Sequence, residues 1–416
     1  MFRRSVAILG AVAGVCALAT TACGSRTSSK PAASGGAAAG GGTIVKIGLD
    51  APLTGGLQAL GLGIQYSAQL AVDTANKQQT VPGVTFQLVP KDDQKSASIG
   101  EQNAAAFVAD PAVVGVVGPL NSAVAQSMQS VFNQANLVEV SPANTNPSLT
   151  QGPNWKSSKT RAYPSYFRDI TTDAIQGPFA ADYVYKTLGI HSVATVDDGQ
   201  TYGVGLVETF TAEFKKLGGT IALAQTATAT TTDYSSVISA VKSSGAKLVY
   251  YGGEYPAGAP LSKELKAAGL NIPEMGGDGV QDPTYIKTAG PASNGDFATV
   301  PGAPLASLPS AKDFIAAYQA ANFPAPYAIY GGTSYDAAES IILSVKAALA
   351  QDGGKVPAGD AFRSQVEKAE QAVSFTGVTG PVAFDQYGDV SSKVITMYKV
   401  ENGAWDQGTY SGPFAG

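Results

Sequence analysis

The stretch VVGVVGPLNSAVAQSM, residues 113–128, joins a strand pattern to a helix pattern through a short turn. Its first half is a valine-rich run typical of a buried strand, and its second half has the composition of a helix. Gly118 and Pro119 end the strand, and a polar turn through Asn121 and Ser122 precedes the helix. Either Ser122 only caps the helix, or its hydroxyl and the free main-chain N–H groups behind it receive an anion.

The same alternation of short strands and longer helices continues on both sides of this stretch. Repeated β-α-β order predicts parallel sheets with helices on both faces, and the series starts again near residue 173. We therefore expect an α/β fold with two doubly wound, Rossmann-like lobes. The expected strands are residues 44–50, 84–93, 113–118, 137–142, 192–198, 220–226 and 247–253, and the expected helices are residues 63–77, 96–110, 122–136, 173–189, 203–219, 233–245, 261–269, 311–322 and 333–351.

Length and composition support two globular units. The chain has 416 residues, of which 44% are apolar and 14% are charged. Its formal net charge is -5, and no run of lysine and arginine occurs. Nucleic acid is therefore not an expected partner.

The first residues have the features of an export signal. Arg3 and Arg4 precede an apolar run at 5–19, which is too short to cross a bilayer. The run ends before Cys23 in a pattern that resembles a bacterial lipobox, although Thr20 stands where leucine is usual. We expect a lipoprotein signal peptide at 1–22, lipidation of Cys23 and a flexible linker at 23–43. Cleavage of an ordinary signal peptide nearby is the alternative.

Ligands of open parallel sheets bind beyond the carboxyl ends of the strands, so the loops after the strands are the candidate sites. The loops at 118–123 and 141–147 contain small hydroxyl residues and main-chain N–H groups, which suit a carboxylate. The later loops contain Tyr202, Glu254 and Asp278, which suit a cation. A zwitterion such as a free amino acid would satisfy both sets.

These loops also carry a family resemblance. The segments IGLDAPLTGG, KDDQ, VVGVVGPLNSAVA, VSPANTNPSL, DDGQTYGVGL, VYYGGEYP and MGGDGV occur in this order between residues 47 and 280. They resemble the signatures of the leucine/isoleucine/valine-binding proteins, which are type I periplasmic substrate-binding proteins of ABC transporters. The resemblance covers residues 44 to about 400. It implies two lobes joined by a hinge that the chain crosses three times.

The resemblance also implies roles for individual residues. The ligand carboxylate would be held by Ser122, the main chain of Ala143 and Thr145, and the ligand ammonium by Tyr202, Glu254 and Asp278. Asp278 is one carbon shorter than the glutamate of the best-known member, Glu254 replaces a tyrosine, and Leu60 replaces an aromatic residue. The expected pocket wall is Leu60, Gly279 and Tyr330, with Tyr66 as a further candidate.

Each assignment has a structural alternative. Thr145 can stabilise a turn, Tyr202 can be an interface aromatic, and Asp278 can be an ordinary turn residue between glycines. Asp92 and Asp93 are expected to be structural rather than part of a metal site.

The expected organisation is a two-lobed clamp. Lobe I would comprise residues 44–172 with 302–388, and lobe II residues 173–301 with 389–416. We expect a monomeric extracytoplasmic binding protein, attached to the membrane by its lipid alone, that delivers an apolar amino acid to the permease and ATPase of an ABC importer. No cofactor or metal is expected.

Three alternative functions remain open. The same clamp could serve a receptor that reports the ligand to a partner, or it could bind an amide, urea or an aromatic acid. An enzyme is not expected, because His191 is the single histidine and neither a nucleophile elbow nor a P-loop occurs. A hydrolase acting on amides has no positive sign in the sequence.

Overall fold

The computed structural model describes residues 43–351, 353 and 360–413. Its first sheet has five parallel strands in the order β2-β1-β3-β4-β5. β3 and β4 are buried along their whole length, as expected for strands with helices on both faces. The strands are β1 (Thr43–Ala51), β2 (Val84–Asp92), β3 (Val113–Val117), β4 (Val138–Ser141) and β5 (Tyr166–Arg168), and the helices between them are α1 (Gln58–Gln78), α2 (Ala97–Ala109), α3 (Ser122–Gln134) and α4 (Ser148–Gln151).

The second sheet is larger and mixed. Its strand order is β14-β13-β10-β9-β8-β6-β7, with β15 paired to β13, and β13 runs antiparallel to β10. Its strands are β6 (Ser192–Asp197), β7 (Thr220–Thr226), β8 (Val249–Gly252), β9 (Glu274–Gly276), β10 (Phe297–Pro301), β13 (Val394–Glu401), β14 (Ala404–Trp405) and β15 (Thr409–Pro413). Its helices are α5 (Asp173–Asp182), α6 (Thr201–Lys216), α7 (Ser235–Ser244), α8 (Tyr255–Ala267) and α9 (Pro283–Ala289).

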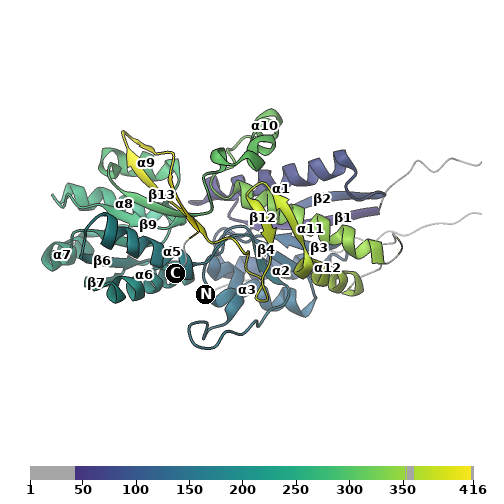
Figure 1. The fold of residues 1–416 in the computed structure, drawn as a ribbon, viewed down its shortest axis with the longest axis horizontal. Coiled ribbons are helices and arrows are strands. Elements are labelled where there is room, and N and C mark those ends of the chain that lie inside the picture. The colour runs from purple at the N-terminus through teal and green to yellow at the C-terminus, as the bar shows by residue number, and fades with distance from the viewer. Residues whose placement is uncertain (1–42, 352, 354–359, 414–416) are drawn as a thin grey trace, which may run out of the picture. The chain divides into compact units, whose positions relative to one another are not determined.

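Three later helices return to the first sheet. α11 (Gly331–Gln351) packs on α1 and β3, and α12 (Asp360–Ala372) packs on α11 and β3, while α10 (Lys312–Ala321) contacts α1 (Figure 1). A hairpin of β11 (Ser374–Gly377) and β12 (Gly380–Ala383) follows α12. We call the first sheet with its helices lobe I and the second lobe II. The chain passes between the lobes at residues 169–172, 302–311 and 384–393.

Most of the expected elements are confirmed, and the differences have local causes. The helix expected at 261–269 begins earlier, at Tyr255, because Pro256 lies in the first turn, where no main-chain N–H is needed. The helix expected at 173–189 ends its α-helical part at Asp182 and continues as a π-helical turn. The elements that were not predicted are β5, β9, β10, α4, α9, α12 and the strands after residue 373.

The predicted signal peptide, Cys23 and most of the predicted linker lie outside the described residues. Within the part of the chain that the structure describes, no helix is both long enough and apolar enough to cross a bilayer. The exact lobe boundaries given above remain a prediction.

Glu370 of α12 is a carboxyl group inside the first lobe, with no exposed surface. Burial raises its pKa from 4.5 to about 7, although the nearby hydroxyl groups of Ser340 and Ser344 oppose the shift. The folded state therefore binds more protons than the unfolded state between these values, and stability falls as pH rises through this window. The Glu370→Gln variant should gain about 3 kcal/mol relative to wild type between pH 4.5 and pH 8.

Urea unfolding of both proteins across this pH range measures the difference. The exposed Glu101, changed to glutamine, serves as the control and should follow the wild-type profile. Parallel profiles of wild type and Glu370→Gln would contradict the prediction.

Candidate functional site

Seven of the residues singled out in the sequence line one small cavity between the carboxyl ends of the two sheets. Its volume is about 10 Å³, which is about enough for one water molecule and too small for an amino acid. The loops after β3, β4, β8 and β9 converge here because parallel strands end at the same edge of a sheet. The cavity is lined by Leu120, Asn121, Ser122, Ala143, Tyr202, Glu254, Asp278, Gly279 and Tyr330.

The turn between β3 and α3 brings Ser122 to this cavity. Gly118 has a φ of +119°, and a Cβ there would lie 2.1 Å from the carbonyl oxygen of Asp50, so glycine lets the ends of β1 and β3 approach. Asn121 occupies the N-cap position, and Ser122 is the first helical residue. The Ser122 hydroxyl makes no hydrogen bond to another described residue and is not the helix cap. It faces the cavity beside the positive end of α3.

The loop after β4 carries Ala143 and Thr145. The N–H of Ala143 donates to Ser141 Oγ over 3.2 Å, and Ala143 lines the cavity. Thr145 is fully buried and does not line the cavity, since its hydroxyl lies beside the buried Asp173. The structure thus places Ala143, but not Thr145, at the cavity surface.

Arg168, at the end of β5, contacts the loop after β4 through hydrogen bonds to its main chain. Its Nη1 donates to the carbonyl oxygens of Asn144 and Asn146, each over 2.9 Å. Its Nε pairs with Asp389 Oδ1 at 2.6 Å, and the Arg168 side chain has no exposed surface. Arg168 therefore joins the loop to residue 389 in the third connection between the lobes. No motif in the sequence marks Arg168 as part of the site.

Asp278 is the most heavily bonded carboxylate of the site. Its Oδ1 accepts from Tyr202 Oη at 2.8 Å and from Gln176 Nε2 at 3.1 Å, and its Oδ2 accepts from Tyr330 Oη at 2.7 Å. Burial raises its pKa, and the hydrogen bonds from Tyr330, Tyr202 and Gln176 oppose that rise. Tyr330 precedes α11 of lobe I, so its hydroxyl bridges the lobes.

Glu254, at the start of α8, is bonded by two side chains from lobe I. Its Oε1 accepts from Asn121 Nδ2 at 2.7 Å, and its Oε2 pairs with Lys95 Nζ. Burial lowers the pKa of Lys95, but the Glu254 carboxylate outweighs it, so the net shift is upward. Glu254 therefore already has a cationic partner, a contact that the sequence analysis did not foresee.

Two candidates for the pocket wall lie away from this cavity. Leu60, in the first turn of α1, is fully buried in the core. The Tyr66 ring stacks on Phe323 with centroids 5.0 Å apart. Gly279 is buried and lines the cavity, where a Cβ would approach Gly253 O to 2.8 Å and Tyr202 Cε1 to 3.1 Å. Of the wall residues, only Gly279 and Tyr330 line the cavity.

The acidic character of the lobe II side extends beyond the cavity lining. Burial, reinforced by the charge of Glu254, raises the pKa of Asp198 to about 7. Burial and the charge of Asp278 raise the pKa of Asp173 as well. Burial and mutual repulsion disfavour the ionised form of these carboxyl groups, and a nearby cation would stabilise that form.

Metal binding has no support in the described part of the chain. No cluster of three or more His, Cys, Asp and Glu side chains there is arranged to hold an ion. Asp92 and Asp93 have structural roles, as expected, because Asp92 Oδ1 accepts from the N–H of Gln94 and Asp93 Oδ1 from that of Lys95, two residues on in each case.

Comparison with known proteins identifies the family. The family model described as periplasmic binding protein matches residues 44–404. The Leu/Ile/Val-binding protein homolog 3 of Brucella melitensis is 30% identical over 369 residues, which cover 88% of this chain and 93% of that protein. The leucine-, isoleucine-, valine-, threonine-, and alanine-binding protein of Pseudomonas aeruginosa is 29% identical over 359 residues, covering 85% and 89%.

A solved structure supports the same assignment. The leucine binding protein LivK of Thermotoga maritima superposes with a TM-score of 0.75 at 27% identity, covering 88% of this chain and 97% of that one. Two α/β lobes with largely parallel sheets are thus the type I periplasmic binding protein fold. The chain therefore belongs to the periplasmic binding protein family, among the leucine/isoleucine/valine-binding proteins.

Proposed function

We propose that this protein is the extracytoplasmic substrate-binding lipoprotein of an ABC importer, and that it binds a branched-chain or related apolar amino acid between its lobes. The relatives reported above are named for binding leucine, isoleucine and valine, and the family is periplasmic. One observation carries the proposal: Ser122 with the positive end of α3 and the carboxylate of Asp278 face the same cavity from opposite lobes.

The two sides suit the two charged ends of an amino acid. A carboxylate bound at Ser122 gains from the hydroxyl and from the first amides of α3. An ammonium bound at Asp278 gains a buried carboxylate that Tyr202 and Tyr330 hold in place. Burying both charges is tolerable because each has partners.

Binding requires the lobes to separate and close again. The cavity of about 10 Å³ admits no amino acid, and Glu254 and Asp278 are both contacted from lobe I. Bending at the three connections would open the cleft, and closure on the ligand would then re-form the contacts around it. Leucine would replace part of the contacts that Tyr330 and Asn121 now make, while Lys95 stays paired with Glu254.

The first experiment is a thermal-shift and calorimetric screen of the purified protein. The ligands are leucine, isoleucine, valine, alanine and phenylalanine, with benzoate, acetamide and urea for the alternative ligand classes. At least one apolar amino acid should raise the melting temperature by several degrees, because it binds only the folded state. Stabilisation by benzoate or by an amide alone would overturn the choice of ligand.

Ser122→Ala should weaken binding of that amino acid by about tenfold, because a hydrogen bond to a charged group contributes roughly 1.5–3 kcal/mol. Ser130→Ala is the matched control, since Ser130 lies exposed on the same helix. Isothermal titration measures both variants. Equal affinities of Ser122→Ala and Ser130→Ala would contradict the role of Ser122.

Lys95→Met should also weaken amino-acid binding by at least about tenfold. Glu254 is 5% exposed, so removing its cationic partner leaves a buried carboxylate unpaired in the closed form. The double variant Lys95→Met/Glu254→Gln should recover part of the loss, because both charges are then absent. Tighter binding in Lys95→Met would mean instead that Lys95 competes with the ligand ammonium for Glu254.

Transport and anchoring are tested in cells. Deleting the gene should abolish high-affinity uptake of the bound amino acid if the protein serves a permease. A receptor role would leave uptake unchanged and alter a response to the amino acid. Cys23→Ser should move the protein from the membrane fraction to the soluble fraction if Cys23 is lipidated.

A further inference from the structure

A second and larger cavity lies where the chain crosses between the lobes. Its volume is about 440 Å³. Ile170 and Thr171 come from the first connection, Gly302 to Ala306 from the second, and Val390 and Ser392 from the third. All three connections thus form walls of one cavity. None of the residues that line the small cavity at Ser122 and Asp278 belongs to it.

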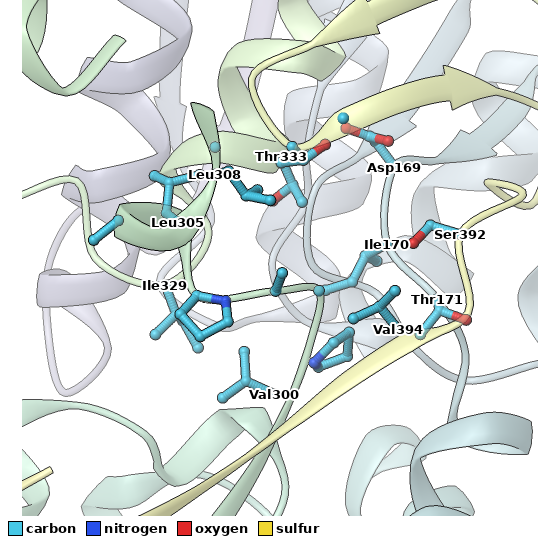
Figure 2. A pocket seen from close by; sticks show the side chains of 18 of the residues that line it. Asp169, Ile170, Thr171, Val300, Leu305, Leu308, Ile329, Thr333, Ser392 and Val394 are labelled. Atoms are coloured by element: carbon cyan, nitrogen blue, oxygen red, sulfur yellow. The ribbon is translucent and has the colours of Figure 1, made fainter. Parts of the chain in front are cut away.

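The walls are mainly apolar. Figure 2 shows Leu305, Leu308 and Ile329 on one side of the cavity and Ile170 and Val394 on the other. Polar side chains, among them Thr171, Thr379 and Ser392, also reach the lining. A cavity of this volume lies in the range of small-molecule sites, about 300–1,000 Å³.

One polar group at the edge of this cavity has no partner. Asp169 and Thr333 both line the cavity (Figure 2). Asp169 is 3% exposed, and its Oδ2 is buried with no hydrogen bond to a described residue. The Thr333 hydroxyl donates elsewhere, to the carbonyl oxygens of Pro142 and Tyr330. A buried carboxyl oxygen without a donor is unusual in folded proteins and gains from a ligand that supplies one.

The charges of the residues that line the cavity indicate which kind of hydrogen-bond donor would suit Asp169. Asp169 and Asp406 both line the cavity, and no lysine, arginine or histidine does. The Asp406 carboxylate accepts only main-chain N–H groups, those of Lys399 and Gly408. An anion would therefore find no cationic group here, whereas a cation would find two carboxyl groups.

We propose that this cavity is a second binding site, for a small organic ammonium ion with an apolar body, and that its occupation changes the opening of the lobes. Burial and the charges of Asp336 and Glu370 raise the pKa of Asp169. An ammonium beside it would favour the ionised form. The apolar body would fill the space between Leu305 and Val394.

The coupling between this cavity and lobe opening follows from the origin of the cavity walls, which belong to the three connections between the lobes. Hinge bending changes the relative directions of the three connections, so the open and closed forms present different cavities. A molecule that contacts all three connections then has different affinities for the two forms. By linkage, it shifts the lobe equilibrium and with it the affinity of the cleft for its own ligand.

The test uses benzylamine as the probe on the purified protein. Saturation-transfer NMR and calorimetry should show binding to wild type, with benzyl alcohol and benzoate at least fivefold weaker. Asp169→Asn should weaken benzylamine at least fivefold, and Ala303→Trp, which fills the cavity, should abolish its binding. Asp278→Asn should leave benzylamine binding unchanged, which separates this site from the cleft.

Ala320→Trp, on the exposed face of α10, should bind benzylamine like wild type. If Ala303→Trp binds benzylamine as well as wild type does, the proposed site is wrong. This test remains valid if Asp169→Asn fails to fold. Benzylamine binding is measured without any amino acid, so a failed amino-acid screen leaves this test intact. An unchanged amino-acid affinity at saturating benzylamine overturns the coupling.

Discussion

Asp278→Asn should lower the affinity for the bound amino acid by at least about 100-fold. The change keeps the shape of the side chain and an oxygen for Tyr202 or Tyr330, but it removes the buried charge that would face the ligand ammonium. Removing one partner of a buried charge pair costs roughly 2–5 kcal/mol, because the other charge stays buried without compensation. Isothermal titration with leucine or the best ligand of the screen measures the loss.

A ligand without the ammonium makes the test specific. Wild type should prefer leucine to 4-methylpentanoate, its deaminated analogue, by a wide margin, and this preference should collapse in Asp278→Asn. The control is Asp282→Asn, because Asp282 is also buried but serves as the cap of α9, accepting from the N–H of Thr284. Leucine affinity within threefold of wild type in Asp278→Asn would show that the ammonium lies elsewhere.

The sequence predicted the order of elements well where the period of the apolar residues was clear. The residue patterns of β1 and β3 indicate only a strand, and that of α3 indicates only a helix. The expected ranges of these elements agree with the structure within a few residues. The first turns of α8 were missed because Pro256 and Pro260 looked like loop residues. β5 and β9 were missed because three residues are too few to show a period.

The candidate site shows the same division. Ser122, Ala143, Glu254 and Asp278 come together because each follows a parallel strand, and the rule for such sheets places those loops at one edge. Lys95 also follows a strand, but its pairing with Glu254 depends on how far the lobes close. The degree of closure between the lobes cannot be predicted from the sequence pattern. Thr145 adjoins the cavity lining in sequence, but its burial against Asp173 depends on packing between loops.

The loop with Ala143 depends on a residue from another element. Arg168 follows no motif in the sequence, yet it donates to the carbonyl oxygens on both sides of Thr145. Arg168→Met should destabilise the protein by about 3–5 kcal/mol, because it leaves Asp389 buried without its cation and two loop carbonyls without donors. Urea unfolding measures this loss, and the affinity for the amino acid should fall with it because the loop loses its support.

Two further variants separate the buried charge from mere loss of a side chain. Lys186→Met removes an exposed ion pair with Asp182, whose two atoms lie 2.8 Å apart, and should change stability by less than about 1 kcal/mol. The double variant Arg168→Met/Asp389→Asn should be more stable than Arg168→Met alone, since the orphaned carboxylate is gone. If the double variant is less stable than Arg168→Met, the unpaired charge of Asp389 is not the source of the loss. The hydrogen bonds from Thr150 and Gln151 to Asp389 would then account for it.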